Sequence, residues 1–481
     1  MEKSEINTDE FCPEYAGLRR NMKPRHLLMI SIGGTIGTGL FLGIGHTIHT
    51  AGPLGTVLAY MAGGLVMYLV LLCLGELATA MPVAGSFQTY ATRFISPAAG
   101  FATGWLYWMS WALCIAADFT AAGIIMNNFY PEVPIYIWCG IFAGFLSSLN
   151  LLSVRAYGES EFWFASIKVF AIIAFIIAGA GLIFGFTSNG QALGTSNFIT
   201  TKGLFPNGIS AVFLTMVFVV YSFQGTELVG IAAGECENPG ENIPKVMKAV
   251  VVRIIVFFWL AVIVLAATIP FTEAGVLESP FAHVFGITGI PYAKMIMTVV
   301  VLTAALSAGN SGLYASSRLL WSMSQEGNAP AWCGKLNSRG VPYNAILITV
   351  IVACASLITK AVAADTVYLF LISSTGLTGC LIWMVIAVCQ INFRREYLSR
   401  GGAIEQLKFR TPLFPAVPIM AFIANLVAIL ALYLAAEYRN MLYCSIPVVL
   451  ITYLVGVYHN RDKRKKGNID KINYSQQVGI K

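Results

Sequence analysis

Long apolar runs dominate this chain, and short polar segments separate them. Each run is about 20 residues long, the length of helix that crosses a hydrocarbon core of about 30 Å. The predicted fold class is therefore an all-α polytopic membrane protein. We expect twelve transmembrane helices, at residues 26–48, 54–80, 98–128, 134–153, 160–186, 208–234, 246–270, 292–323, 342–360, 365–391, 413–436 and 442–459.

The first run is interrupted near its middle, where Ser31-Ile-Gly-Gly-Thr-Ile-Gly-Thr-Gly-Leu-Phe-Leu-Gly43 is rich in glycine. Glycine costs roughly 1 kcal/mol per helical position relative to alanine, so this cluster favours unwinding. Backbone groups that are freed at bilayer depth need partners, so we expect the break to line a cavity. The alternative is that the glycines only allow close helix packing.

The sixth run has a similar polar interruption, Tyr221-Ser-Phe-Gln-Gly-Thr-Glu-Leu-Val-Gly230. Because five helices separate the two starts, the first and sixth spans are expected to run in opposite directions. Two five-helix units of opposite orientation with broken first helices are typical of secondary transporters. The predicted units are the repeats 26–186 and 208–391, two further helices at 413–459, and polar tails at 1–25 and 460–481.

Broken helices offer a positive N-terminal end and a negative C-terminal end near the bilayer midplane. A zwitterionic amino acid carries the two matching charges, and we expect it as the substrate. Its carboxylate is predicted to meet Thr38 and Gly39, in a loop shaped by Thr35 and Gly37. The candidates for contact with its amine and side chain are Gly34, Asp118, Tyr221, Ser222, Phe223, Gln224 and Glu227.

Composition narrows the possible functions. Hydrophobic residues make up 57% of the 481 residues and charged residues 11%, against about 25% charged residues in soluble domains. The net charge of +7 lies mainly in loops and tails, so it does not indicate a nucleic-acid partner. There is no CxxC pair, metal motif, nucleophile–base set or GxxxxGK[ST] motif. We therefore expect no enzyme and no cofactor, and transport that runs on an ion or substrate gradient.

The distribution of lysine and arginine predicts the orientation. These residues concentrate in the N-terminal tail, in alternate loops and in the C-terminal segment 461–466. Because cytoplasmic loops carry the excess of positive charge, both termini are expected in the cytoplasm. The C-terminal basic segment is expected to lie near anionic membrane lipid.

Several motifs together resemble the amino acid transporter family of the amino acid–polyamine–organocation superfamily. The resemblance covers about residues 15–460, and segments 224–228 and 306–316 are most similar to bacterial lysine-specific permeases. It implies an inverted-repeat fold of the leucine-transporter type and a bacterial inner-membrane location. The motifs are Gly34-Thr-Ile-Gly-Thr-Gly-Leu-Phe41, Gly75-Glu-Leu-Ala78, Pro82-Val-Ala-Gly-Ser86, and residues 161–169, 223–231, 233–239, 242–245 and 302–316.

Lys168 is a candidate for proton coupling. It lies nine residues past Glu159, about 13 Å along a helix, where a lysine costs roughly 2.5–3.5 kcal/mol. Burial disfavours its charged form, so it could gain and lose a proton. The resemblance implies that it replaces a sodium ion between helices one, five and eight. The predicted neighbours are Ser307, Asn310 and Ser311; the alternative is a permanently charged lysine bonded to helix-one carbonyls.

Four acidic residues in or near the apolar runs have open roles. Glu227 could pair with the ε-ammonium of a lysine substrate or act as a protonatable gate. Asp118 could bind the distal amine of the substrate or form a hydrogen bond between helices. Glu76 and Glu235 lie near helix ends expected in the cytoplasm, where they could belong to an inner gate or to a structural network.

These observations predict a secondary transporter that imports a cationic amino acid, with L-lysine first, by proton symport and alternating access. The proton would be the coupling ion. One alternative is an amino acid exchanger on the same fold. Another is a lysine-sensing transceptor with a membrane regulator as its partner, which the short polar tails do not favour. The sequence does not predict the oligomeric state.

Overall fold

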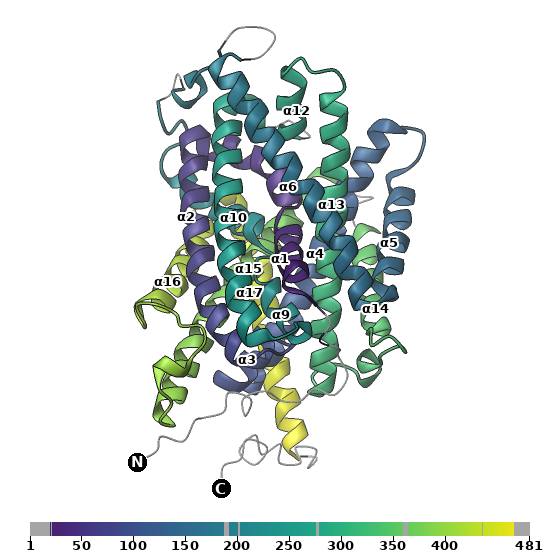
Figure 1. The fold of residues 1–481 in the computed structure, drawn as a ribbon, viewed down its shortest axis with the longest axis vertical. Helices are drawn as coiled ribbons and strands as arrows, with labels where there is room; N and C mark the ends of the chain where they lie inside the picture. The colour runs from purple at the N-terminus through teal and green to yellow at the C-terminus, as the bar shows by residue number, and fades with distance from the viewer. Residues whose placement is uncertain are drawn as a thin grey trace.

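The chain folds into a bundle of long helices, most of which run along the longest axis of the molecule (Figure 1). The computed structural model describes residues 20, 22–186, 192–200, 203–275, 279–358, 364–434 and 436–465. In these ranges extended pairing is limited to two isolated bridges, Met22 with Cys236 and Thr200 with Gly203. The predicted all-α class is confirmed.

The first half of the bundle begins with a discontinuous helix. The first expected span consists of α1, the short π-helix η2 and the start of α2, while the second span continues in α2 beyond Gly52 and Pro53. At Gly52 the backbone leaves helical geometry with a φ of 75°. The elements are α1 (Pro24–Thr35), η2 (Gly39–Gly43), α2 (Ile44–Ala80), α3 (Phe87–Phe94), α4 (Pro97–Phe129), α5 (Ile135–Leu152) and α6 (Val154–Phe184).

The second half also begins with a discontinuous helix, made of α7, α8 and α9. The elements are η3 (Ser196–Phe198), α7 (Ser210–Leu214), α8 (Met216–Phe223), α9 (Leu228–Ala232), η4 (Ala233–Glu235), α10 (Pro239–Thr268), α11 (Phe271–Ala274), α12 (Pro280–Ile287), α13 (Ala293–Gln325), η5 (Ala331–Gly334), α14 (Tyr343–Ile358), α15 (Ala364–Ser399), η7 (Ile404–Gln406), α16 (Ala416–Ala431), η8 (Leu432–Leu434) and α17 (Ala436–Lys465).

Each of the twelve expected spans coincides with helical residues. By length and hydropathy, nine helical segments within the described ranges could cross a membrane. This count treats Pro24–Ala80 as one segment and excludes α17 and the shorter Tyr343–Ala355. The number of crossings and the boundaries of the two repeats therefore stay predictions.

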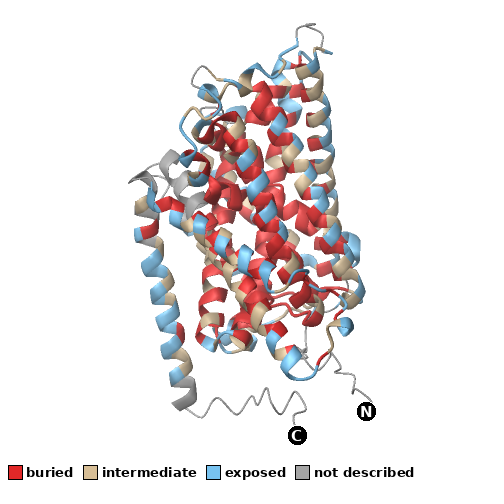
Figure 2. Ribbon diagram, turned by 90° about the vertical axis from the view of Figure 1, so that its left-hand side faces the viewer, coloured by how far each residue is buried: buried red, intermediate tan, exposed pale blue. Residues whose placement is uncertain are grey.

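The buried residues follow the axis of the bundle, and the outer helices expose apolar side chains (Figure 2). α4 packs extensively on α13, and α10 on α2. On the outer surface of α6, Trp163 is 67% exposed and Phe170 73% exposed. An apolar outer face around a core that holds buried polar groups is the arrangement expected of helices that face lipid.

Candidate functional site

Both predicted helix interruptions are present. α1 ends at Thr35, and Ile36 has a non-helical ψ of 84° before η2 begins at Gly39. α8 ends at Phe223, and Gln224 has an extended ψ of 140°. Gly225 follows with a φ of +105°, and α9 begins at Leu228. The sequence therefore located both breaks correctly.

The two breaks touch each other through their backbones. A β-carbon on Gly225 would lie 2.6 Å from the carbonyl carbon and oxygen of Gly34 and 2.9 Å from the amide nitrogen of Thr35. The hydroxyl of Ser31 donates a hydrogen bond to the carbonyl of Thr226 at 3.0 Å. Glycine is needed at 225 for its positive φ and for this close approach.

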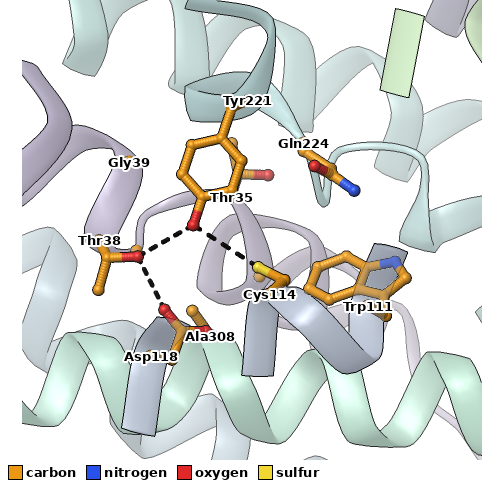
Figure 3. Close-up of a pocket in the computed structure, with 11 residues that line it drawn as sticks. Thr35, Thr38, Gly39, Trp111, Cys114, Asp118, Tyr221, Gln224 and Ala308 are labelled. Atoms are coloured by element: carbon orange, nitrogen blue, oxygen red, sulfur yellow. Dashed lines mark hydrogen bonds between the residues drawn. The ribbon is translucent and has the colours of Figure 1, made fainter. Parts of the chain in front are cut away.

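A small cavity lies where the breaks face α4 (Figure 3). Most of the candidates for contact with the substrate head group line it. The lining residues are Gly34, Thr35, Gly37, Thr38, Gly39, Trp111, Cys114, Asp118, Tyr221, Gln224 and Ala308.

One wall of the cavity carries a chain of polar contacts. The hydroxyl of Thr38 donates to Oδ1 of Asp118 at 2.8 Å and lies 3.2 Å from the phenolic oxygen of Tyr221. That oxygen lies 3.7 Å from Sγ of Cys114. Asp118 is buried, and its Oδ2 has no hydrogen-bond partner among the described residues. The cavity therefore contains a carboxylate oxygen that can accept from a ligand.

The unwound part of the first helix provides a partial positive charge, opposite in sign to the Asp118 carboxylate. The first amide groups of a helix have no intrahelical carbonyl partner, and Thr38 and Gly39 occupy this place at the start of η2. Such an end favours an anion. The close packing of Gly37 against Ala308 and of Gly39 against Ser222 leaves no room for larger side chains there. Carboxylate binding at these residues stays a prediction.

Lys168 lies on α6, is 0% exposed, and donates a hydrogen bond to the carbonyl of Gly33. This contact fits the proton-carrying interpretation and the structural one equally. Ser307 and Asn310, its predicted neighbours, instead donate to the carboxylate of Glu161. Ser311 lies beside Gly34. Glu161 had no predicted role. It precedes Lys168 by seven residues, so the two side chains lie on the same face of the helix.

Three other candidates lie outside the cavity lining. The carboxylate of Glu227 accepts from Tyr107 at 2.9 Å and from the amide of Gly225 at 3.2 Å, so it supports the second break. Ser222 contacts the hydroxyl of Tyr60 at 2.9 Å, and Phe223 stacks on Phe258. The contact of Tyr107 with Glu227 depends on how α4 packs beside the second break.

The remaining acidic candidates belong to buried ion-pair networks. Glu76 pairs with Arg394 and accepts from the amide of Thr411 at 2.6 Å. Glu235 accepts from Tyr314, and its Oε1 lies 3.5 Å from Nε of Arg318. Both arrangements fit the structural interpretation, and a gating role for either residue stays a prediction.

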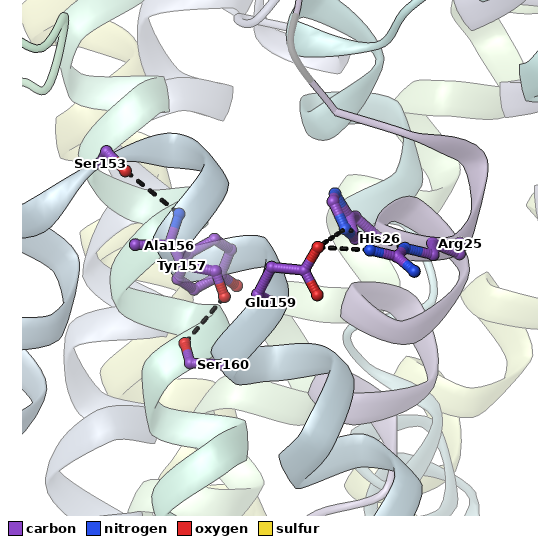
Figure 4. A network of polar contacts seen from close by, with 7 residues as sticks. All are labelled: Arg25, His26, Ser153, Ala156, Tyr157, Glu159 and Ser160. Atoms are coloured by element: carbon purple, nitrogen blue, oxygen red, sulfur yellow. Dashed lines mark hydrogen bonds and ion pairs between the residues drawn. The ribbon is translucent and has the colours of Figure 1, made fainter.

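A further contact joins the start of α1 to α6. Glu159 accepts from Arg25 and lies 3.2 Å from Nε2 of His26 (Figure 4). Next to it, Met22 pairs with the segment after η4: its amide donates to the carbonyl of Glu235, and its carbonyl accepts from Glu237, each at 3.0 Å. These contacts tie the start of α1 to α6 and to the segment around η4.

Comparisons with known proteins agree with this arrangement. The family model described as "Amino acid permease" matches residues 26–469. The chain is 50% identical to the amino-acid permease RocE of Bacillus subtilis over 451 residues, which cover 93% of this chain and 96% of the relative. It is 47% identical to a putative histidine permease of the same organism, with 93% and 95% covered.

Two further likenesses concern the subgroup and the fold. The chain is 42% identical to the lysine-specific permease LysP of Escherichia coli, with 92% of this chain and 93% of the relative covered. The crystal structure of MhsT in complex with L-phenylalanine superposes with a TM-score of 0.58 at 14% identity, covering 84% of this chain and 98% of that one. The second likeness shows the fold alone, and it confirms the predicted leucine-transporter type.

Proposed function

Because the chain belongs to the amino acid permease family, a family of membrane transporters, we propose that it imports a cationic amino acid by proton symport and alternating access. L-lysine is the first candidate. We also propose that it works in the bacterial inner membrane with both termini in the cytoplasm, as the loop charges indicate.

The position of Asp118 carries the proposal of a cationic substrate. It is the carboxylate in the cavity lining, and its Oδ1 is held by Thr38 while its Oδ2 has no partner in the described part of the chain. A buried acid in a membrane protein is costly unless a cation or a water-filled cavity compensates it. The distal amine of lysine would supply that cation. Relatives named for lysine and histidine transport support a basic substrate.

The proposed binding pose follows from the two charges of the site. The substrate carboxylate would lie at the amides of Thr38 and Gly39, and the α-ammonium at carbonyls near Gly34 and Tyr221. The distal amine would bind Oδ2 of Asp118, and because Asp118 lies beside Thr38 the side chain would curl back within the cavity. Closure around the substrate would then involve both breaks together, because Gly225 lies directly on Gly34.

Proton coupling is proposed for Lys168. Its ammonium holds the carbonyl of Gly33, which directly precedes the cavity-lining Gly34. Loss of the proton would weaken this charge-assisted bond and free α1 to move relative to α6. Proton release and movement of the first helix would thereby be linked.

The test is uptake of radiolabelled L-lysine by proteoliposomes that contain the purified protein. We expect an imposed pH gradient to drive accumulation without internal substrate, and unlabelled lysine, arginine or ornithine to compete better than leucine or phenylalanine. If uptake strictly requires internal amino acid, the protein is an exchanger and not a symporter. Equal competition by leucine would contradict the assignment of a cationic substrate.

A further inference from the structure

Glu161 is a buried carboxylate that the proposed transport mechanism leaves unassigned. It lies on α6 and is 0% exposed. Two side chains from α13 hold it: the hydroxyl of Ser307 donates to Oε1, and the amide of Asn310 donates to Oε2 at 2.9 Å. Asn310 is itself oriented, because its Oδ1 accepts from Asn150 at 2.7 Å. Glu161 therefore receives two donors that the surrounding helices fix in place.

The same carboxylate touches the first helix at the residue that Lys168 holds. A β-carbon on Gly33 would collide with Oε1 of Glu161, and the carbonyl of Gly33 accepts from Lys168. Glu161 and Lys168 thus contact one residue of α1 from two positions on α6. Because Gly33 directly precedes the cavity-lining Gly34, any movement of this part of α1 changes the surroundings of both charged groups.

Several charged or titratable groups surround Glu161. Lys168 and Tyr157 on its own helix interact with it electrostatically, and Lys168 also interacts with Asp118 of α4. Tyr157 in turn interacts with Arg318 of α13 and Glu235 of η4. From α1, His26 lies over Gly158. α10 and α12 pack on α6 through apolar residues, Val264 and Phe281 among them.

The hydrogen bonds around Glu161 accommodate its ionised form. An ionised carboxylate only accepts, a protonated one can also donate, and a serine hydroxyl can do either. With the Asn310 amide donating to Oε2 and the Ser307 hydroxyl to Oε1, the described conformation accommodates Glu161 as an anion that interacts with the Lys168 ammonium. Removing either charge would leave the other buried without compensation, which is unfavourable in a low-dielectric interior.

We propose that Glu161 and Lys168 form one proton-binding unit, and that the coupled proton titrates on this pair. When the site opens to water, a proton from solvent binds the Glu161 carboxylate, an O–H bond forms, and the net charge of the pair changes from zero to +1. Release reverses the step. The inference rests on the proposed proton symport. It moves the titrating proton from the Lys168 ammonium, which stays charged throughout, to the neighbouring Glu161 carboxylate, because interacting groups titrate as a pair.

The experiment compares two transport modes in proteoliposomes for the wild type and Glu161→Gln. One mode is lysine uptake driven by a pH gradient, with a trapped pH-sensitive dye that reports proton entry; the other is exchange of external for internal lysine. We expect E161Q to lose gradient-driven uptake by about tenfold or more, since a one-unit change in proton affinity is tenfold in occupancy. Exchange should be retained, and its dependence on pH should flatten.

Two serine variants separate coupling from structural support. Ser307→Ala removes one donor but leaves the charge, so the pH optimum of uptake should shift while coupling persists. Ser166→Ala is the matched control on α6, because its hydroxyl donates to the carbonyl of Phe162 in the same helix; it should behave as wild type. Should E161Q fail to insert, Glu161→Asp and S307A provide the pH profile.

The outcomes are distinguishable. If the wild type shows no uptake under a pH gradient but exchanges lysine, the proposed symport fails, and the proton-coupling role of the pair fails with it. If the wild type is coupled and E161Q keeps gradient-driven uptake and the dye response, the coupled proton does not titrate on the Glu161–Lys168 pair. If E161Q loses exchange and driven uptake equally while S307A leaves the pH optimum unchanged, Glu161 is structural and the inference is overturned.

Discussion

Gly225 of the second break lies directly on the backbone of Gly34 in the first, so close that a β-carbon on Gly225 would come within 2.6 Å of the Gly34 carbonyl. The two half-helices therefore meet main chain to main chain. The site between them depends on this contact more than on any one side chain, since both breaks contribute residues to the cavity lining.

The first prediction concerns this contact. Gly225→Ala should destabilise the fold by roughly 2–5 kcal/mol, from the left-handed backbone and from overpacking, and should abolish lysine uptake. Thermal unfolding in detergent and uptake by proteoliposomes measure the two effects. Gly144→Ala on α5 is the control, because a β-carbon there meets nothing within 4 Å. Wild-type stability in G225A would contradict the close packing.

The second prediction tests the carboxylate in the cavity. Asp118→Asn keeps the size of the side chain and an oxygen for Thr38 but removes the charge. Lysine binding should weaken by about 2 kcal/mol or more, roughly thirtyfold in Kd, as measured by binding of radiolabelled lysine to the purified protein. Cys114→Ala alters the same cavity wall without changing its charge and should have a much smaller effect. Unchanged affinity in D118N would remove the basis for a cationic substrate.

The third prediction concerns the buried ion pair of α2 and α15. Glu76→Gln leaves the Arg394 guanidinium without its counter-charge, and breaking a buried pair in this way costs about 3–5 kcal/mol. The unfolding temperature in detergent should fall accordingly. Glu396→Gln is the comparison: it removes the partly exposed pairs with Arg93 and Arg400 and should cost less, about 1 kcal/mol or below for each pair. Equal losses in the two variants would argue against a structural role for Glu76.

The fourth prediction uses Cys236 as a reporter at the end where α1 begins. Burial, and to a smaller extent the Glu237 carboxylate, raises the pKa of the Cys236 thiol to about 12. Since the thiolate is the reactive form, maleimide should label it very slowly near pH 7. Labelling should accelerate as pH rises. It should also accelerate when the structure opens beside α1 and exposes Cys236, because the pKa of the thiol then returns toward its ordinary value of about 8.5.

Glu159→Gln, which removes the contact with Arg25 and His26, should increase that labelling no more than a few-fold, because exposed ion pairs contribute little. The assay needs Cys12 replaced by serine, and Cys236→Ser confirms the labelled position. Cys333 in η5 serves as the internal reference, and its labelling should not change. A rise at Cys333 equal to that at Cys236 would indicate general loosening instead of opening beside α1.

Local composition was sufficient to predict the broken helices and most of the cavity lining. Glycine is a poor helix former, so the glycines of residues 33–39 and Gly225 marked the breaks, although Gly37, Gly39 and Gly225 are also needed for close packing. Asp118 was identifiable because an acid within an apolar run needs compensation. The short helices α3, α11 and α12 were not predicted, because each is much shorter than the run of about 20 apolar residues that indicates a membrane span.

Side-chain partners could not be predicted in the same way. Glu227 sits in the second break as expected, but it turns toward Tyr107 and Gly225 because of how α4 packs. Ser307 and Asn310 lie on the expected helix, yet they bond Glu161 rather than Lys168. In each case the hydrogen-bond partner depends on how one helix is rotated against its neighbour. The spacing of residues along a single helix does not determine this rotation.

The position of α17 has a practical consequence for handling the protein. This helix stands at the margin of the bundle, and most of its described side chains are exposed (Figure 2). It is held to its neighbours by contacts such as Gly456 with Phe101 and His459 with the carbonyl of Gly327. Surfactant that competes for its apolar surface would loosen it before the central helices. Extraction that retains a ring of native lipid should therefore preserve the C-terminal helix best.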